Sequence, residues 1–308
     1  MAGEVPAIHA VELTKHYGHI EALAGLTMSV PRGEIFGFLG PNGAGKTTAV
    51  KLLLGLTSPT AGDAWLLGEP IGRAGARRHV GYLPELFRYP AWLSPAEVLR
   101  FHCRLIDLPR TVREDKIEAA LTTVGLRLRA NDRVGTFSKG MQQRLGLAVA
   151  MLGDPQVVFL DEPTSALDPV GRHDVREIIR ALRTRGTAVF LNSHLLTEVE
   201  QVCDRVAVVD HGRVVASGTL DDILGGGVAV RLHVTGVTGL ASLLCRWGQV
   251  VAEGEWVTVR GVDTENIADI VAELVARGAR VHAVEPQRQS LEDRFLELLS
   301  AADDGAAA

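Results

Sequence analysis

The chain has 308 residues, of which 46% are hydrophobic and 22% charged, a length that suits about two domains with cores of their own. Its net charge of -5 argues against a general nucleic-acid binder, and no apolar run is long enough to span a membrane. The cysteines, Cys103, Cys203 and Cys245, lie far apart, which excludes a disulfide scaffold and fits a reducing cytosol. The first residues lack the basic start and apolar run of a secretory signal.

Aliphatic segments alternate with helical ones over the first two-thirds of the chain, which predicts an α/β domain. The predicted strands are Ile8–Leu13, Glu34–Leu39, Ala64–Leu67, Val157–Leu160, Ala188–Leu191 and Val206–Val209. The predicted helices are Lys46–Leu54, Pro95–Leu105, Arg113–Val124, Ser138–Leu152, Arg172–Arg183 and Leu195–Val202. Continuous apolar strands are typical of a parallel sheet covered on both faces. No strand is predicted within about 88–152, so this stretch is expected to form a helical subdomain.

The run of glycines at 225–227 is predicted to be a hinge between a first domain, residues 1–224, and a small α+β domain, residues 225–300. In the second domain the predicted order is strand, helix, strand, strand, helix, strand, at 228–234, 240–247, 250–252, 256–259, 264–276 and 280–284. This order is compatible with a ferredoxin-like module. An amphipathic helix is predicted at Leu291–Leu299, and residues 301–308 are expected to form a disordered tail.

A glycine-rich loop between an apolar strand and a helix matches the pattern G-x-x-x-x-G-K-[ST]. Small residues at these positions let backbone N–H groups approach a phosphate, and the helix that follows adds the positive end of its dipole. The lysine can reach the outer phosphates, and the hydroxyl after it can ligate Mg²⁺. The predicted nucleotide-binding residues are Gly40, Pro41, Asn42, Gly43, Ala44, Gly45, Lys46, Thr47 and Thr48.

Two acids end the apolar strand Val157–Leu160. Asp161 is expected to hold Mg²⁺ through its water shell, together with Thr47. Glu162 is expected to accept a proton from the attacking water. The glycine-rich loop alone is compatible with kinases, GTPases and ATPases. The two acids after the strand narrow this set of enzyme classes.

The segment Phe137–Arg144, with the sequence FSKGMQQR, resembles the signature loop of ABC (ATP-binding cassette) ATPases. Further elements follow in the order of that family. Tyr17 resembles the aromatic residue that stacks on adenine, Ser165–Asp168 resembles the D-loop, and His194 resembles the switch histidine. The resemblance implies a P-loop NTPase cassette: a RecA-like parallel sheet with additional antiparallel strands and a helical subdomain.

A narrower resemblance, to the ATPase subunits of drug and antibiotic exporters of the daunorubicin-resistance type, rests on three segments. They are Gly81–Glu85, the variant signature itself and the ending Ser290–Phe295. It implies that ATP and Mg²⁺ are bound and that hydrolysis powers export through separate membrane-spanning permease subunits. The chain is then expected at the cytoplasmic face of the cell membrane as a peripheral subunit, with no nucleic-acid partner.

In this family two subunits enclose two ATP molecules head to tail, so Ser138 and Gly140 would face the γ-phosphate held by the partner's phosphate loop. Because the chain has a single phosphate loop, it would pair with itself or with a paralogue. One departure from the family is Glu85, where glutamine is usual. A carboxylate there can still face Mg²⁺ or the water, and the added negative charge predicts slower or more Mg²⁺-sensitive hydrolysis.

Two other classes of function fit these motifs less well. A non-transport ABC ATPase of DNA repair would need long coiled coils between Lys46 and Asp161, and one of translation would usually carry two cassettes. An ATP-dependent regulatory sensor without hydrolysis is disfavoured by the presence of Glu162 and His194.

Overall fold

The computed structural model describes residues 5–165, 167–225, 228–237, 239–263, 265–288 and 290–306. The predicted hinge glycines 226 and 227, Ala166 of the predicted D-loop, and residues 307–308 lie outside these ranges. The chain divides into two compact units between Ser217 and Gly218. None of the helices in the described ranges combines the length and the apolar character that a membrane span requires.

A mixed sheet forms the centre of the first unit, with the strand order β10-β9-β3-β8-β7-β6. Its strands are β3 (Ile35–Leu39), β6 (Val80–Leu83), β7 (Val157–Asp161), β8 (Ala188–Asn192), β9 (Arg205–Asp210) and β10 (Arg213–Thr219). The pairs from β6 through β7, β8 and β3 to β9 are parallel. Every residue of β3, β7 and β8 is buried, as expected for a parallel sheet covered on both faces.

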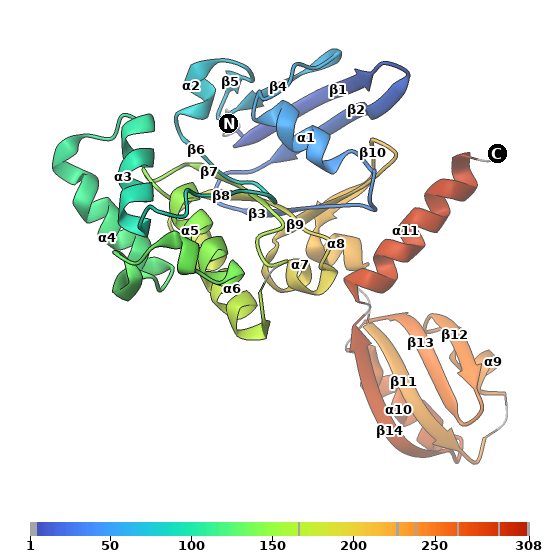
Figure 1. Cartoon of the computed structure of the whole chain (residues 1–308). Helices are drawn as coiled ribbons and strands as arrows, with labels where there is room; N and C mark the ends of the chain where they lie inside the picture. The colour runs from blue at the N-terminus through green and yellow to red at the C-terminus, as the bar shows by residue number, and fades with distance from the viewer. Residues whose placement is uncertain are drawn as a thin grey trace. The chain divides into compact units, whose positions relative to one another are not determined.

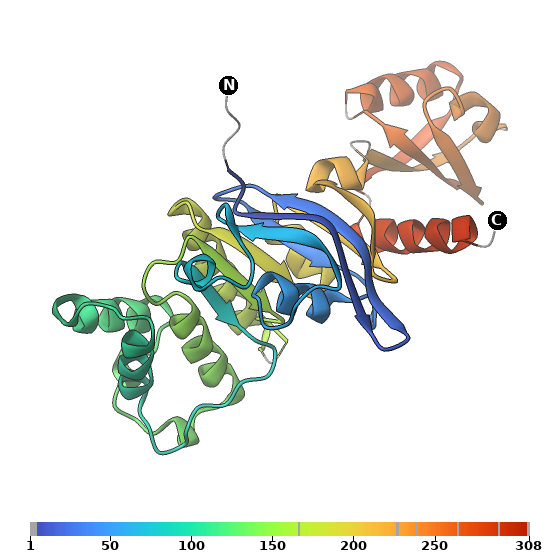
Figure 2. The same cartoon turned by 90° about the horizontal axis from the view of Figure 1, so that it is seen from above.

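A second, antiparallel sheet has the strand order β2-β1-β4-β5. Its strands are β1 (Ile8–Tyr17), β2 (Ile20–Val30), β4 (Ala61–Leu66) and β5 (Glu69–Pro70). Helix α1 (Lys46–Leu53) lies between this sheet and the parallel one in both Figure 1 and Figure 2. Side chains of β1, β2, α1, β3 and β8 therefore share one apolar core.

Helices replace strands over residues 88–152, all of which the structure describes. This region contains α3 (Pro95–Leu105), α4 (Arg113–Thr123), α5 (Lys139–Ala150) and the 3-10 turns η1 (Arg110–Val112), η2 (Arg127–Arg129) and η3 (Val134–Thr136). Ser94 and Glu97 form a capping box that begins α3. The first unit also contains the helices α2 (Ala74–Arg77), α6 (Pro169–Thr184) and α7 (Leu196–Val202).

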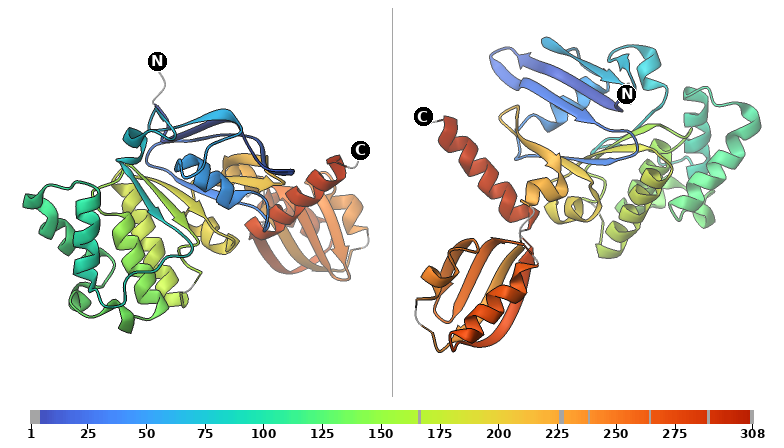
Figure 3. Two further views of the ribbon diagram at one scale, coloured as in Figure 1. Left: turned by 45° about the horizontal axis from the view of Figure 1, so that its top comes forward. Right: turned by 180° about the vertical axis from the view of Figure 1, so that it is seen from behind.

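The second unit contains α8 (Leu220–Leu224), β11 (Val228–Thr235), α9 (Leu240–Leu244), β12 (Gln249–Glu253), β13 (Trp256–Val262), α10 (Asn266–Ala276), β14 (Arg280–Arg288) and α11 (Leu291–Ala306). The strands pair antiparallel in the order β12-β13-β11-β14, which is the ferredoxin-like arrangement predicted from the element order. Figure 3 shows α10 lying across this sheet, and its buried Ile270 and Leu274 join the unit's own core.

The structure differs from the prediction in several elements. Strands β2, β6 and β10 and the short helices α2 and α8 were not predicted. The boundary between the two units along the chain falls after residue 217 instead of 224. The reason is that α8 belongs to the second unit, where Arg294 Nε donates to the carbonyl of Ile223 at 3.0 Å. Helix α11 continues to Ala306, so residues 301–306 of the expected tail are helical. The alanines there are strong helix formers.

Candidate functional site

The carboxyl ends of β3, β6, β7 and β8 meet at one edge of the parallel sheet, where ligands of open α/β sheets bind. A cavity of about 540 Å³ lies at this edge. It brings together many of the site residues predicted from the sequence. These are Asn42, Gly43, Gly45, Lys46, Thr47, Thr48, Glu85, Asp161, Glu162 and His194.

The glycine-rich loop has a shape that only glycine permits at two positions. A Cβ on Gly40 would lie 2.2 Å from the carbonyl oxygen of Val209. Gly45, the N-cap of α1, has φ 95°, and a Cβ there would lie 2.3 Å from the carbonyl oxygen of Ala22. The loop therefore packs tightly against β2 and β9. The N–H groups at the start of α1 have no partner within the helix and can bind an anion.

The predicted loop residues Gly40, Pro41 and Ala44 do not line the cavity but hold the loop's shape. Lys46 Nζ donates to the carbonyls of Gly40 at 2.6 Å and Pro41 at 3.0 Å. Ala44 is buried, and its carbonyl accepts from the N–H of Gly212 at 3.1 Å. The ammonium of Lys46 is thus directed across the mouth of the loop, where an anion would replace the weaker carbonyl partners.

Three carboxylates surround this ammonium. Burial lowers the pKa of Lys46, and the nearby charges of Glu162, Asp161 and Glu85 oppose that shift. Burial likewise raises the pKa of Asp161, aided by Glu85 and Glu162 and opposed by a hydrogen bond from Asn192. A cluster of carboxylates facing one buried lysine is short of positive charge, so the site is suited to a divalent cation.

Glu162 and His194 are in direct contact. The N–H of His194 donates to Glu162 Oε1 at 2.9 Å, and its Nδ1 lies 2.7 Å from Oε2. The second contact has an ion-pair distance but not the alignment of a hydrogen bond, so the buried Oε2 has no hydrogen-bond donor among the described residues. Glu162 also has φ 53°, a strained backbone conformation for a residue with a side chain. The carboxylate of Glu162 is therefore held in place by His194, through the backbone N–H at Oε1 and the imidazole beside Oε2.

Asn192 was not predicted as a site residue. It lies beside Asp161 in the parallel register of β7 and β8, and its Nδ2 donates to Asp161 Oδ1 at 2.5 Å. The feature of the sequence that could have identified Asn192 is its place at the end of a predicted strand, two residues before His194.

Tyr17, predicted to stack on adenine, lies outside the cavity lining. Tyr17 is 47% exposed, and Lys15 Nζ lies 5.0 Å from the centroid of its ring. Ile20, Glu21 and Ala22 line the cavity on that side instead.

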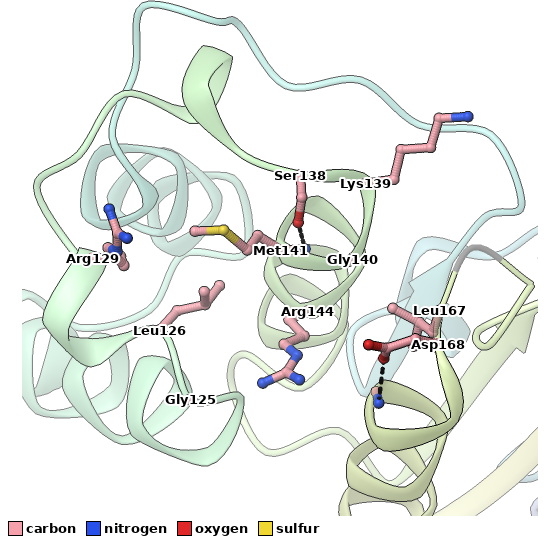
Figure 4. Close-up of a pocket in the computed structure, with 11 residues that line it drawn as sticks. Gly125, Leu126, Arg129, Ser138, Lys139, Gly140, Met141, Arg144, Leu167 and Asp168 are labelled. Atoms are coloured by element: carbon pink, nitrogen blue, oxygen red, sulfur yellow. Dashed lines mark hydrogen bonds between the residues drawn. The ribbon is translucent and has the colours of Figure 1, made fainter.

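Ser138 and Gly140 belong to a second cavity of about 570 Å³ (Figure 4). Ser138 is the N-cap of α5, and its hydroxyl accepts from the N–H of Met141 at 3.3 Å. Across the cavity lie Leu167 and Asp168, the N-cap of α6. The side chain of Lys139 points away from this cavity in Figure 4. The structure thus separates the predicted signature residues from the phosphate loop of the same chain.

The first cavity fits a nucleotide with Mg²⁺. A lysine and the N–H groups of a helix start face it, and glycine at positions 40 and 45 allows the tight loop conformation that directs these groups. No cluster of three or more His, Cys, Asp and Glu is arranged for a metal in the described ranges. Mg²⁺ takes one or two protein ligands and completes its shell with phosphate and water.

Comparison with known proteins gives one family. The model of the ABC transporter family matches residues 23–165. An uncharacterized ABC transporter ATP-binding protein of Nostoc sp. is 40% identical over 289 residues, covering 92% of this chain and 85% of the relative. Nod factor export ATP-binding protein I of Rhizobium sp. is 35% identical over 299 residues, covering 95% and 96%.

Among solved structures, an ATP-binding subunit of an ABC transporter superposes with a TM-score of 0.66 at 32% identity, covering 70% of this chain and 91% of that one. The predicted cassette fold, with its parallel core, antiparallel sheet and helical region, is confirmed. The chain belongs to the family of ABC transporter ATP-binding proteins, the ATPase subunits of these transporters.

Proposed function

We propose that this chain is the ATP-hydrolysing subunit of an exporter, which binds MgATP between two chains arranged head to tail. The observation that carries the proposal is the division of the site into two cavities. The phosphate loop, the acids and His194 line the first, whereas Ser138 and Gly140 line the second. Each chain therefore offers two different halves of a nucleotide site.

The phosphate loop binds the triphosphate. The N–H groups at the start of α1 and the ammonium of Lys46 receive the outer phosphates, for which Lys46 exchanges its carbonyl partners in the loop. Thr47, Asp161 and Glu85 are the oxygen ligands available to Mg²⁺, directly or through water. Bound Mg²⁺ would neutralise charge on the phosphates and the surrounding carboxylates.

Glu162 activates the water that attacks the γ-phosphorus. As the new P–O bond forms, the water's proton passes to the Glu162 carboxylate, and the bond to the β-phosphate oxygen breaks to give ADP and phosphate. His194 holds Glu162 Oε1 through its backbone N–H. Its side chain lines the same cavity as the phosphate loop and would donate to the γ-phosphate there. Glu85 adds negative charge beside this centre, so hydrolysis should depend strongly on Mg²⁺.

A partner chain completes the site. Its Ser138 hydroxyl and Gly140 N–H, at the start of a helix, would reach the γ-phosphate bound by this chain. ATP would then stabilise the closed dimer, and hydrolysis would release it. The partner is a second copy of the chain or a paralogue.

Export is supported by the name of the relative from Rhizobium sp., which acts in Nod factor export. Permease subunits would dock at the helical region, where Leu86, Trp92 and Phe101 are 87%, 74% and 55% exposed. The chain would then act at the cytoplasmic face of the membrane as a peripheral subunit.

The variant Glu162→Gln tests the proposal. It keeps the shape of the side chain and removes its basicity, so ATP binding should persist while hydrolysis falls at least about 100-fold, or ~2.7 kcal/mol of barrier. Light scattering should show a dimer that forms only with ATP. Phosphate release near the wild-type rate from this variant would refute the assignment of Glu162.

A further inference from the structure

Helices α6 and α7 are joined by an ion pair that none of the steps above uses. Arg176 Nη1 of α6 donates to both carboxylate oxygens of Glu198 in α7, at 2.9 and 2.8 Å. The two side chains are only 16% and 10% exposed. A nearly buried pair of this kind is shielded from solvent and salt, unlike an ion pair on the surface.

The pair anchors the helix that follows the switch histidine. Glu198 lies in the first turn of α7, four residues after His194. The N-cap of α7 is Leu195, which has no side-chain oxygen to cap the helix, and α7 is only seven residues long. A helix this short has little stability of its own, so its position depends on its tertiary contacts.

Helix α6 supplies a firm partner. It is sixteen residues long, begins with Pro169 and is capped by Asp168, whose Oδ1 accepts from the N–H of Gly171 at 2.8 Å. Figure 1 shows α6 and α7 side by side beneath the parallel sheet. The link from Arg176 through Glu198 thus fixes the start of α7, and with it the backbone N–H of His194 that binds Glu162.

We propose that Arg176 and Glu198 are positioning residues for ATP hydrolysis, because their ion pair holds His194 against Glu162. The proposal rests on the proposed function of Glu162 and His194. It predicts a selective loss. Neither residue lines the first cavity, so ATP binding should be unaffected while the chemical step slows.

The test is the double variant Arg176→Met/Glu198→Met, which removes the pair without leaving one buried charge uncompensated. Its kcat should fall about 10-fold or more, since small displacements of catalytic groups have effects of this size. The KM for ATP and the melting temperature should stay near those of the wild type. Arg176→Lys, which keeps the charge but loses the two-pronged geometry, should recover part of kcat.

Arg180→Met is the matched control. Arg180 lies one turn further along α6 and also reaches α7. It donates to the carbonyl of Gln201 at 2.9 Å, in the last turn of α7, whereas His194 precedes the first turn. This variant should keep the wild-type kcat. A wild-type kcat in the double variant, or an equal loss in Arg180→Met, would overturn the proposal. So would a double variant whose KM and melting temperature change along with kcat. Absence of hydrolysis by the wild-type chain would instead count against the proposed function.

Discussion

Gly45→Ala should weaken ATP binding through the shape of the phosphate loop. The residue has φ 95°, and an added Cβ would lie 2.3 Å from the carbonyl oxygen of Ala22 and 3.0 Å from Leu23 Cδ2. The first distance is about 1 Å short of ordinary van der Waals contact. Because the neighbour is a backbone atom of β2, the loop must move rather than the strand. That movement comes in addition to ~1–2 kcal/mol for a non-glycine residue in the left-handed region.

A displaced loop misaligns its N–H groups with the phosphates. Loss of one hydrogen bond to a charged group costs ~1.5–3 kcal/mol, which corresponds to a rise of about 10- to 100-fold in the Kd for ATP. Titration with a fluorescent ATP analogue measures this, with thermal unfolding in parallel. Gly186→Ala is the control, since it has φ 80° with nothing within 4 Å of an added Cβ. It should lose stability but not affinity. Unchanged ATP affinity in Gly45→Ala would refute the reasoning.

Three further predictions concern the charges at the first cavity. Burial raises the pKa of Asp161, so the nucleotide-free chain should lose stability as the pH rises through that pKa, and Asp161→Asn should remove this loss. Melting temperatures over a pH series without Mg²⁺ check it, and an identical pH dependence in both proteins would contradict it. Glu85→Gln removes a like charge beside Asp161 and should hydrolyse ATP at least as fast as wild type, with less dependence on Mg²⁺; a large fall in kcat would mean that Glu85 has another role. Lys46→Ala removes a charge-assisted phosphate contact and should raise the Kd for ATP at least about 10-fold, and an unchanged Kd from calorimetric titration would argue against the loop as the phosphate site.

The glycine-rich loop and the Asp161–Glu162 pair could be read from the sequence because each is local, with a strand, a turn and a fixed set of residue types. The ferredoxin-like order of the second unit could also be predicted from the sequence, because turn residues separate its apolar segments. Strand β2 was missed because Ala22, Ala24 and Gly25 dilute its apolar pattern, and its pairing with β1 contains irregular register. It is recognised as a strand only once β1 lies beside it.

Contacts between distant segments could not be read in this way. The boundary near residue 217 depends on Arg294 reaching Ile223, 71 positions away. The contact of His194 with Glu162 follows from the pairing of β7 with β8. No local pattern in the sequence predicts it. The exclusion of Tyr17 from the cavity lining likewise reflects where β1 ends relative to α1, which is a property of the packed sheets.

Mixing two inactive variants tests most directly whether the two cavities belong to one shared site. Lys46→Ala disables the first cavity, and Ser138→Ala disables the second. If a site combines the phosphate loop of one chain with the signature residues of another, a mixed dimer contains one intact site. Hydrolysis should therefore reappear when the two variants are combined, although each alone is inactive. A mixture that stays as inactive as its components, while dimers of the two variants form, would contradict the account.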